Sequence, residues 1–221
     1  MKLEYSKYKH ISFDLWLTLI KSNPEFKNKR NLLFKDFFGL ENTIEKITEV
    51  VRYYDVLCNN INEKTGLNFD TFEIYYLILN ALNARLDDIT TEHLNQFYNE
   101  TEILFMDNKP ELINPQTNLM FKDMISQNKT ISILSNTGFI KGYTLRKLII
   151  DYELNDYFKF QIYSDEVGYS KPNPKMFQLV FDNISVLKNI KKQEIIHVGD
   201  NQNADYNGAI SFGFNAYLLI N

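Results

Sequence analysis

The apolar residues of the chain follow two patterns, which divide it into an α/β part and a helical part. Short runs rich in β-branched and aromatic residues predict five strands, at His10–Leu15, Thr130–Leu134, Phe160–Tyr163, Glu194–Val198 and Asn215–Ile220. From about Asn118 onward, stretches with helical spacing separate these runs; examples are Thr117–Gln127, Ile140–Ile150, Lys175–Leu187 and Asn203–Phe212. Such alternation predicts a Rossmann-like α/β core, with a parallel sheet and helices on both faces.

The segment between the first and second predicted strands follows a different pattern, because strand-like alternation is scarce there. Apolar residues recur three and four positions apart on both sides of Thr65-Gly66: Ile44, Ile47, Val51, Tyr54 and Cys58 before it, and Phe72, Ile74, Tyr75, Ile78 and Leu82 after it. This spacing predicts about four helices. We therefore predict a core domain of residues 1–20 and 105–221, with an inserted all-helical cap domain of residues 21–104.

Composition and charge narrow the class of protein. The 221 residues are 24% charged and 44% apolar, which is ordinary for a globular protein. A net charge of −4 without a basic run gives no support to a nucleic-acid partner. Cys58 is the only cysteine, so no intramolecular disulfide can form, and no apolar stretch is long enough to span a membrane. We expect a cytoplasmic protein that acts on a small molecule; the oligomeric state does not follow from the sequence.

Four polar motifs stand at the ends of predicted strands, at the edge where open α/β sheets bind ligands. They are Asp14 with Thr18, Ser135-Asn136-Thr137-Gly138, Lys171-Pro172-Asn173-Pro174-Lys175-Met176-Phe177, and His197-Val198-Gly199-Asp200 continuing to Asp205. Singly, the first three are typical of ordinary turns and helix caps. Their order, each at a strand end, instead indicates one shared site. The helical insert follows the first of these strands and is placed to act as a lid.

Together, the motifs resemble those of the haloacid dehalogenase-like (HAD) hydrolases, and the resemblance covers the whole chain. The forms Lys-Pro-x-Pro-x-Met-Phe and Gly-Asp-x-x-x-x-Asp-x-x-Gly-Ala are similar to the subfamily with a helical cap after the first strand. The nucleophile motif of the family is Asp-x-Asp-x-Thr. This chain has Asp14 and Thr18 in the outer positions, but Trp16 replaces the second carboxylate.

The resemblance implies a Mg²⁺-dependent phosphohydrolase or phosphotransferase that acts through an aspartyl-phosphate. Asp14 would be the nucleophile, and Thr18 would belong to the same catalytic motif. Asp14, Asp200 and the backbone oxygen of Trp16 would hold the Mg²⁺, a hard ion that prefers oxygen ligands.

The other motifs would complete the site. The resemblance implies that the Ser135 hydroxyl and the Asn136 backbone N–H bind a phosphoryl oxygen. Lys171 would neutralise the negative charge of substrate and carboxylates and act in both binding and catalysis. Asp205 would lie outside the direct metal ligands and hold Lys171 or a metal-bound water.

Trp16 removes the proton donor that family phosphatases carry two residues after the nucleophile. An indole N–H donates a hydrogen bond but does not titrate in a useful range. General acid–base help of this kind is typically worth about 10² to 10⁴ in rate. We therefore expect substrates with good leaving groups, such as aryl or acyl phosphates, or an acid supplied by the cap, for which His93 is a candidate.

Two other functions stay open at this point. The 2-haloacid dehalogenases also carry an aromatic residue at the position of Trp16 and need no metal. However, they have Ser-Ser-Asn around the position of Asp200, and an additional carboxylate without a metal would repel their anionic substrate. A catalytically impaired phosphoryl-binding protein is the third reading. Asp200 therefore favours metal-dependent phosphoryl chemistry.

Overall fold

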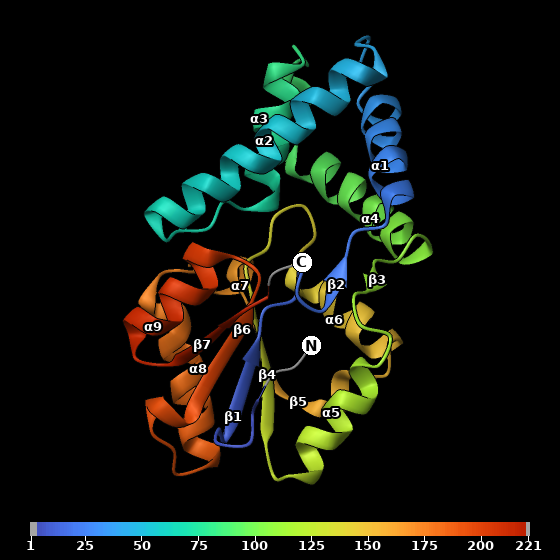
Figure 1. The fold of residues 1–221 in the computed structure, drawn as a ribbon. Coiled ribbons are helices and arrows are strands. Elements are labelled where there is room, and N and C mark those ends of the chain that lie inside the picture. The colour runs from blue at the N-terminus through green and yellow to red at the C-terminus, as the bar shows by residue number, and fades with distance from the viewer. Residues whose placement is uncertain (1–3, 220–221) are drawn as a thin grey trace.

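The computed structural model describes residues 4–219, in which a helical part stands above an α/β part (Figure 1). A five-stranded parallel sheet has the order β5-β4-β1-β6-β7. Its strands are β1 (His10–Phe13), β4 (Thr130–Ser135), β5 (Phe158–Tyr163), β6 (Ile195–Gly199) and β7 (Asn215–Leu218). All five predicted strands are present, although Ile220, the predicted end of the last, lies outside the described residues.

Helices cover both faces of the sheet, so the predicted α/β fold is confirmed. On one face, α5 (Thr117–Ser126) and α6 (Gly142–Asp151) pack against β1 and β4. On the other, α8 (Pro174–Leu187) and α9 (Gly208–Phe212) pack against β4, β5 and β6. Burial on both faces explains why β1 and β4 are buried along almost their whole length, including the polar Ser12 and Ser132.

The helix predicted at Asn203–Phe212 is shorter and less regular than expected. Residues Gln202–Asn207 form a π-helical segment, and α9 begins only at Gly208. The Asn201 side chain accepts hydrogen bonds from the N–H groups of Asn203 and Ala204, and the Asp205 side chain turns back to accept the Asn201 N–H. These polar contacts compete with regular helical hydrogen bonding.

Four helices stand over the carboxyl ends of the strands (Figure 1). They are α1 (Pro24–Phe37), α2 (Ile44–Thr65), α3 (Thr71–Ala81) and α4 (Thr91–Asp107), with a short 3₁₀ turn at Leu86–Asp88, and we call α1–α4 the cap helices. Their own core includes an aromatic cluster around Phe34, Tyr75 and Phe97. The predicted insertion of helices after the first strand is therefore present; the domain boundaries at 20/21 and 104/105 stay predictions.

Backbone contacts are among those that join the cap helices to the core. The short antiparallel strands β2 (Ile20–Lys21) and β3 (Glu111–Leu112) pair where the chain leaves the core and returns to it. At the other end, Gly66 terminates α2 with a φ of 70°, and its carbonyl oxygen accepts from the Ser170 N–H and the Asn173 side chain. A Cβ at Gly66 would lie 2.9 Å from Asn173 Nδ2, so the close approach of the two parts requires glycine. α7 (Ser164–Val167) precedes this loop.

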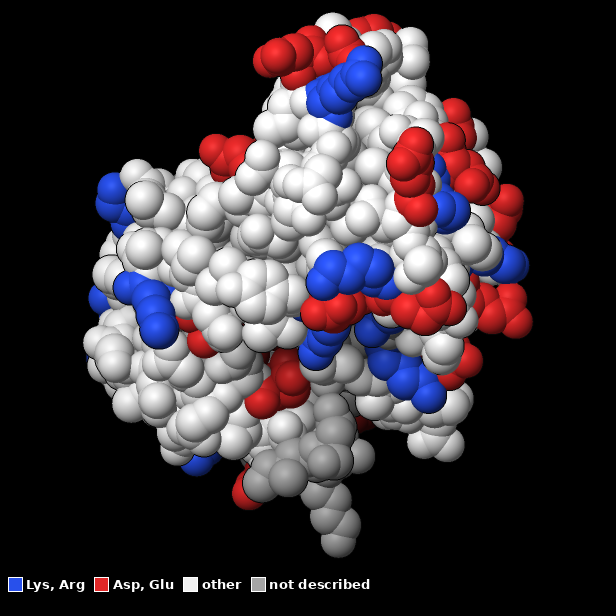
Figure 2. All heavy atoms as spheres, turned by 90° about the horizontal axis from the view of Figure 1, so that it is seen from above, with Lys and Arg blue, Asp and Glu red and all other residues white. Residues whose placement is uncertain are grey.

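Charges of both signs are mixed on the upper face of the molecule. Figure 2 shows Lys and Arg side chains lying beside Asp and Glu side chains at the top and on the right of this view. Several are paired, as in the ion pair between Lys46 and Glu49 on α2. Among residues 4–219, no helix is both long and apolar enough to cross a membrane.

Candidate active site

The strand ends bring the predicted motifs together around Asp14. Asp14 directly follows β1, and its N–H donates to the Val198 carbonyl oxygen at 2.8 Å. β1 lies between β4 and β6, so Ser135 at the end of β4 and Asp200 after β6 flank Asp14. Asp14 is 6% exposed, while Asp200 is half-buried. The sequence motifs therefore form one site at the carboxyl edge of the sheet.

Lys171 lies at the centre of this site and is 1% exposed. Its ammonium donates to Asp14 Oδ1 at 2.7 Å, to Asp205 Oδ1 at 2.6 Å and to the Leu134 carbonyl oxygen at 2.8 Å. An ammonium has three N–H groups, so each has an acceptor. This full set of partners allows a charged lysine to be buried between two carboxylates.

The loop that carries Lys171 is fixed to the end of β4 by Asn136. The Asn136 side chain accepts from the Lys171 N–H at 2.7 Å and donates to the Lys171 carbonyl oxygen at 3.0 Å. Ser135 next to it donates through Oγ to Asp14 Oδ1 at 3.1 Å. The predicted binding of a phosphoryl oxygen by the Asn136 backbone N–H stays a prediction. The role of the Asn136 side chain in holding the Lys171 loop was not predicted from the sequence.

His197 contacts the same oxygen of Asp205 as Lys171 does, and sequence reasoning missed this histidine. Its Nε2 lies 3.1 Å from Asp205 Oδ1, and its Nδ1 lies 3.0 Å from Ser12 Oγ. A carboxylate only accepts, so Nε2 carries the proton and Nδ1 accepts from the Ser12 hydroxyl. Burial lowers the pKa of His197, although its bond to Asp205 opposes this shift, so the ring is neutral at pH 7.

Gly199 makes room for the Asp205 side chain. A Cβ built on Gly199 would lie 2.2 Å from the Asp205 carboxyl group, closer than any side chain tolerates. The glycine in Gly-Asp-x-x-x-x-Asp therefore lets the second carboxylate pass close to the backbone and reach Lys171.

Burial and pairing shift the pKa values of the charged groups in different directions. Burial raises the pKa of Asp14 to about 6, although the Lys171 ammonium lowers it in part. Burial also raises the pKa of Asp200, with the Asp205 charge adding to the effect. For Asp205, burial acts upward, but Lys171 and His197 outweigh it and hold the pKa below its usual range. Burial likewise opposes the charge of Lys171, but Asp14 and Asp205 outweigh it and raise the lysine pKa.

Three carboxylates meet at this edge. Asp14, Asp200 and Asp205 each offer one oxygen, and these oxygens lie within 4.8 Å of one another. Lys171 is the one cation in contact with them within residues 4–219, and it pairs with Asp14 and Asp205 but not with Asp200. The cluster therefore retains negative charge, which a cation would relieve.

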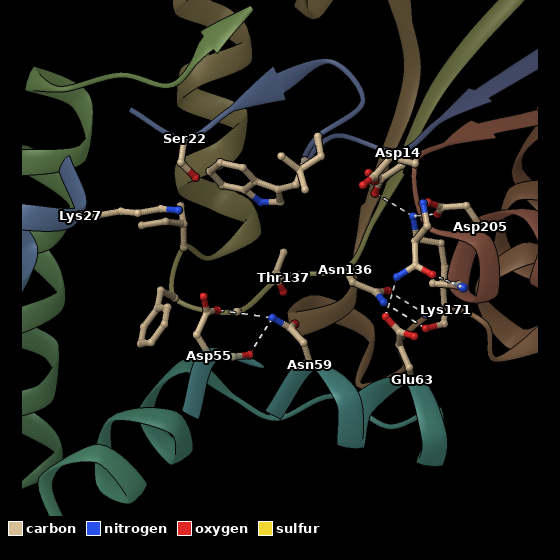
Figure 3. Close-up of a pocket in the computed structure, with 18 of the residues that line it drawn as sticks. Asp14, Ser22, Lys27, Asp55, Asn59, Glu63, Asn136, Thr137, Lys171 and Asp205 are labelled. Carbon is tan, nitrogen blue, oxygen red and sulfur yellow. Dashed lines mark hydrogen bonds and ion pairs between the residues drawn. The ribbon is translucent and has the colours of Figure 1, made fainter. Parts of the chain in front are cut away.

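A cavity of about 320 Å³ lies between this site and the cap helices (Figure 3). On the core side, Asp14, Asn136, Lys171 and Asp205 line it; on the cap side, Asp55, Asn59 and Glu63 of α2 point into it. Glu63 also accepts from Asn201 Nδ2 at 2.6 Å, which joins α2 to the turn that follows Asp200. Sequence reasoning missed the α2 residues, although their spacing of four places them on one helix face.

Trp16 lines the cavity, as its place in the motif predicted, and is half-buried. Its ring packs edge-on against Phe105, with 6.3 Å between centroids. Thr18, in contrast, does not line this cavity: it is 6% exposed, and its hydroxyl has no hydrogen-bond partner within residues 4–219. The structure therefore buries Thr18 beside the site and does not bring its hydroxyl into contact with Asp14.

His93, the candidate proton donor of the cap, does not line this cavity. His93 lies in the first turn of α4, where its backbone N–H donates to Thr90 Oγ1 and its ring accepts from the Thr90 N–H. It lines a different cavity, which Phe38 and Arg85 also line. His93 is a helix-capping residue remote from Asp14.

The chain is similar in sequence to two known proteins. The chain is 37% identical to the rhythmically expressed gene 2 protein of Drosophila melanogaster over 75 residues, which are 34% of this chain and 28% of that protein's length. It is 23% identical to the glyceraldehyde 3-phosphate phosphatase of Methanothermobacter thermautotrophicus over 83% of this chain and 84% of the relative.

A solved structure has the same fold. The HAD-hydrolase YfnB from Bacillus subtilis, bound to magnesium, superimposes with a TM-score of 0.70 at 15% identity, covering 96% of this chain and 88% of YfnB. The family model of the haloacid dehalogenase-like hydrolases matches residues 8–213, which include every motif described above and every described strand except β7. The chain therefore belongs to the haloacid dehalogenase-like hydrolase family.

Proposed function

We propose that the protein is a Mg²⁺-dependent phosphohydrolase or phosphotransferase that forms an aspartyl-phosphate on Asp14. The observation that carries this proposal is the contact of the buried Asp14 carboxylate with Lys171 and Ser135, beside the carboxylates of Asp200 and Asp205. The phosphatase named among the relatives, which matches along most of its length, supports the same chemistry.

The donor set fits Mg²⁺. The cluster offers carboxylate oxygens, which are the ligands that hard divalent cations prefer, and three carboxylates beside one lysine leave negative charge to neutralise. Asp14, Asp200 and the backbone oxygen of Trp16 would hold the ion. When bound, the ion would offset the negative charge of the phosphoryl oxygens.

The side chains of the chain would then carry out the transfer. Asp14 attacks phosphorus, and the bond between phosphorus and the leaving oxygen breaks as the aspartyl bond forms. Lys171 places a positive charge beside the nucleophile, and the Ser135 hydroxyl and Asn136 N–H donate to phosphoryl oxygens. Water, or an acceptor hydroxyl in a phosphotransferase, then takes the phosphoryl group and restores Asp14.

The leaving group must depart without the usual proton donor, because Trp16 occupies the cavity wall there. The indole N–H does not titrate, and His93 is remote from the cavity. The leaving groups of aryl and acyl phosphates are weakly basic anions, which depart without protonation. They are therefore the expected class of substrate in this proposal.

An assay with p-nitrophenyl phosphate tests the proposal. We expect Mg²⁺-dependent phosphate release that EDTA abolishes and that Asp14→Asn lowers by at least about 10³-fold, since it removes the nucleophile. Asp182→Asn, on the exposed face of α8, is the matched control and should retain full activity. Metal-independent chloride release from L-2-chloropropionate would overturn the proposal, and tight phosphate binding without turnover of either compound would indicate a binding protein.

We also expect Mg²⁺ affinity to fall as the pH drops below about 6. Burial raises the pKa of Asp14 to about 6, so protons compete with the cation for this carboxylate at lower pH. Trp16 is the only tryptophan and lines the cavity, so its fluorescence should report the titration. Equal affinities at about pH 5 and about pH 8 would contradict the assignment of Asp14 as a ligand.

A further inference from the structure

Arg30 on α1 is a buried cation in the wall of the cavity. It is 8% exposed and lines the same cavity as Asp14 and Lys171. Its Nε and Nη2 both donate to one acceptor, Asn31 Oδ1, at 3.3 and 3.0 Å. Within residues 4–219, no carboxylate forms an ion pair with it. Burying a guanidinium without a counter-ion is costly, so this position favours binding of an anion.

The carboxylates around the cavity have other partners. Asp55 is close enough for its charge to act on Arg30, but its Oδ2 pairs with Arg52 at 3.1 Å. Glu63 accepts from Asn201, and two carboxylates of the acid cluster contact Lys171. The α1 wall of the cavity therefore carries a positive charge that no side chain in contact with it compensates.

Aromatic rings fix the orientation of this guanidinium. Its central carbon lies 4.5 Å from the centroid of the Phe139 ring and 5.8 Å from that of Phe26. Of the five N–H groups of an arginine, two donate to Asn31, and the other three have no partner within the described part of the chain. The edge of a held guanidinium matches the two oxygens of a carboxylate.

The position of Arg30 places this edge away from the nucleophile. Lys27 and Arg30 are three residues apart on α1 and thus share a side of the helix. In Figure 3, Lys27 lies at the opposite end of the cavity from Asp14 and Lys171. A substrate with its phosphoryl group at Asp14 would therefore extend its leaving group toward α1. A cavity of about 320 Å³ restricts it to a small molecule.

We propose that Arg30 binds a carboxylate on the leaving group, so that the substrates are small aryl or acyl phosphates whose leaving group carries a carboxylate. The inference rests on the proposed function and names its substrate class. The lining of the cavity includes five carboxylates, Asp14, Asp55, Glu63, Asp200 and Asp205, against the three cations Lys27, Arg30 and Lys171. This balance favours a singly charged carboxylate over a second, doubly charged phosphate.

Binding of non-hydrolysable phosphonates tests this inference independently of turnover. Calorimetry in Mg²⁺ would compare 3-phosphonopropionate with propylphosphonate, which has the same length but lacks the carboxylate. We expect the wild type to bind the phosphonocarboxylate at least about tenfold more tightly, the effect of one charge-assisted contact. Arg30→Met should abolish this preference and leave propylphosphonate binding unchanged, whereas Lys27→Met, which removes an exposed cation from the same cavity, should keep it.

The outcomes separate the two proposals. Equal binding of both phosphonates by the wild type would overturn the role of Arg30 and leave the proposed function standing. So would a preference that survives in Arg30→Met, or one lost in Lys27→Met alone. Failure of both phosphonates to bind would contradict the proposed function and this inference with it. Arg30→Lys keeps the charge but not the planar fork, so a reduced preference in this variant supports the inference even if Arg30→Met does not fold.

Discussion

Replacing Lys171 with methionine is expected to lower the free energy of unfolding by about 3 to 5 kcal/mol at neutral pH and to abolish turnover. Lys171 is 1% exposed and contacts the carboxylates of Asp14 and Asp205, both also buried. Methionine fills a similar volume but leaves two negative charges without their cation. Urea unfolding followed by circular dichroism would measure the change, and Lys122→Met on the exposed surface of α5 is the matched control.

The pH dependence of this loss distinguishes electrostatics from packing. In the wild type, the pKa of Asp205 lies below its usual range, because Lys171 and His197 outweigh the effect of burial. A depressed folded-state pKa adds stability above the unfolded pKa of about 4, and this contribution is lost as the pH falls through the folded-state pKa. The penalty of Lys171→Met should therefore be largest at neutral pH and shrink as acid neutralises the carboxylates.

A second substitution makes the test of Lys171 sharper. Asp205→Asn in the Lys171→Met background removes one of the two uncompensated charges, so we expect it to recover part of the lost stability while activity stays absent. A penalty of equal size at about pH 4 and about pH 7, with no recovery in the double variant, would show that Lys171 acts through packing alone.

The core of the fold and most of the site could be predicted because their signals are local in the sequence. Each strand is a short apolar run, and parallel strands bring their carboxyl ends to one edge of the sheet, so the residues after β1, β4 and β6 had to meet. Gly199 shows the physical basis of one motif, since a side chain there would collide with Asp205. The glycine six positions before Asp205 in the motif is therefore required for steric reasons that act within one short stretch of the sequence.

The missed features depend on contacts between residues far apart in the chain. The Asn136 side chain fixes a loop 35 positions away, and Ser12 orients the ring of His197 across 185 positions. Helical periodicity placed Cys58 of α2 inside the cap, but it did not show that Glu63 would reach Asn201. The local sequence left His93 open as a candidate donor, because it does not distinguish a helix-capping residue from an active-site residue.

Trp16→Asp is expected to raise the rate of alkyl phosphate hydrolysis by about 10²-fold or more, with a much smaller effect on aryl phosphates. A carboxyl group two residues after the nucleophile can protonate an alkoxide, which leaves poorly without a proton, whereas a phenolate leaves unaided. The substitution also removes a packing contact, because the half-buried indole of Trp16 packs on Phe105. Kinetics with ethyl phosphate and p-nitrophenyl phosphate, on protein checked for folding by circular dichroism, would measure both rates.

Trp16→Asn decides whether a gain comes from the proton or from the space that the ring vacates. Asparagine has the shape of aspartate but cannot donate a proton as an acid, and it opens the cavity to the same extent. If the missing acid limits turnover, Trp16→Asp should exceed Trp16→Asn on ethyl phosphate and match it on p-nitrophenyl phosphate. Equal activity of the two variants on both substrates would mean that the indole blocks access. Trp16 would then select substrates by size, and the release of the leaving group would not depend on an acid at this position.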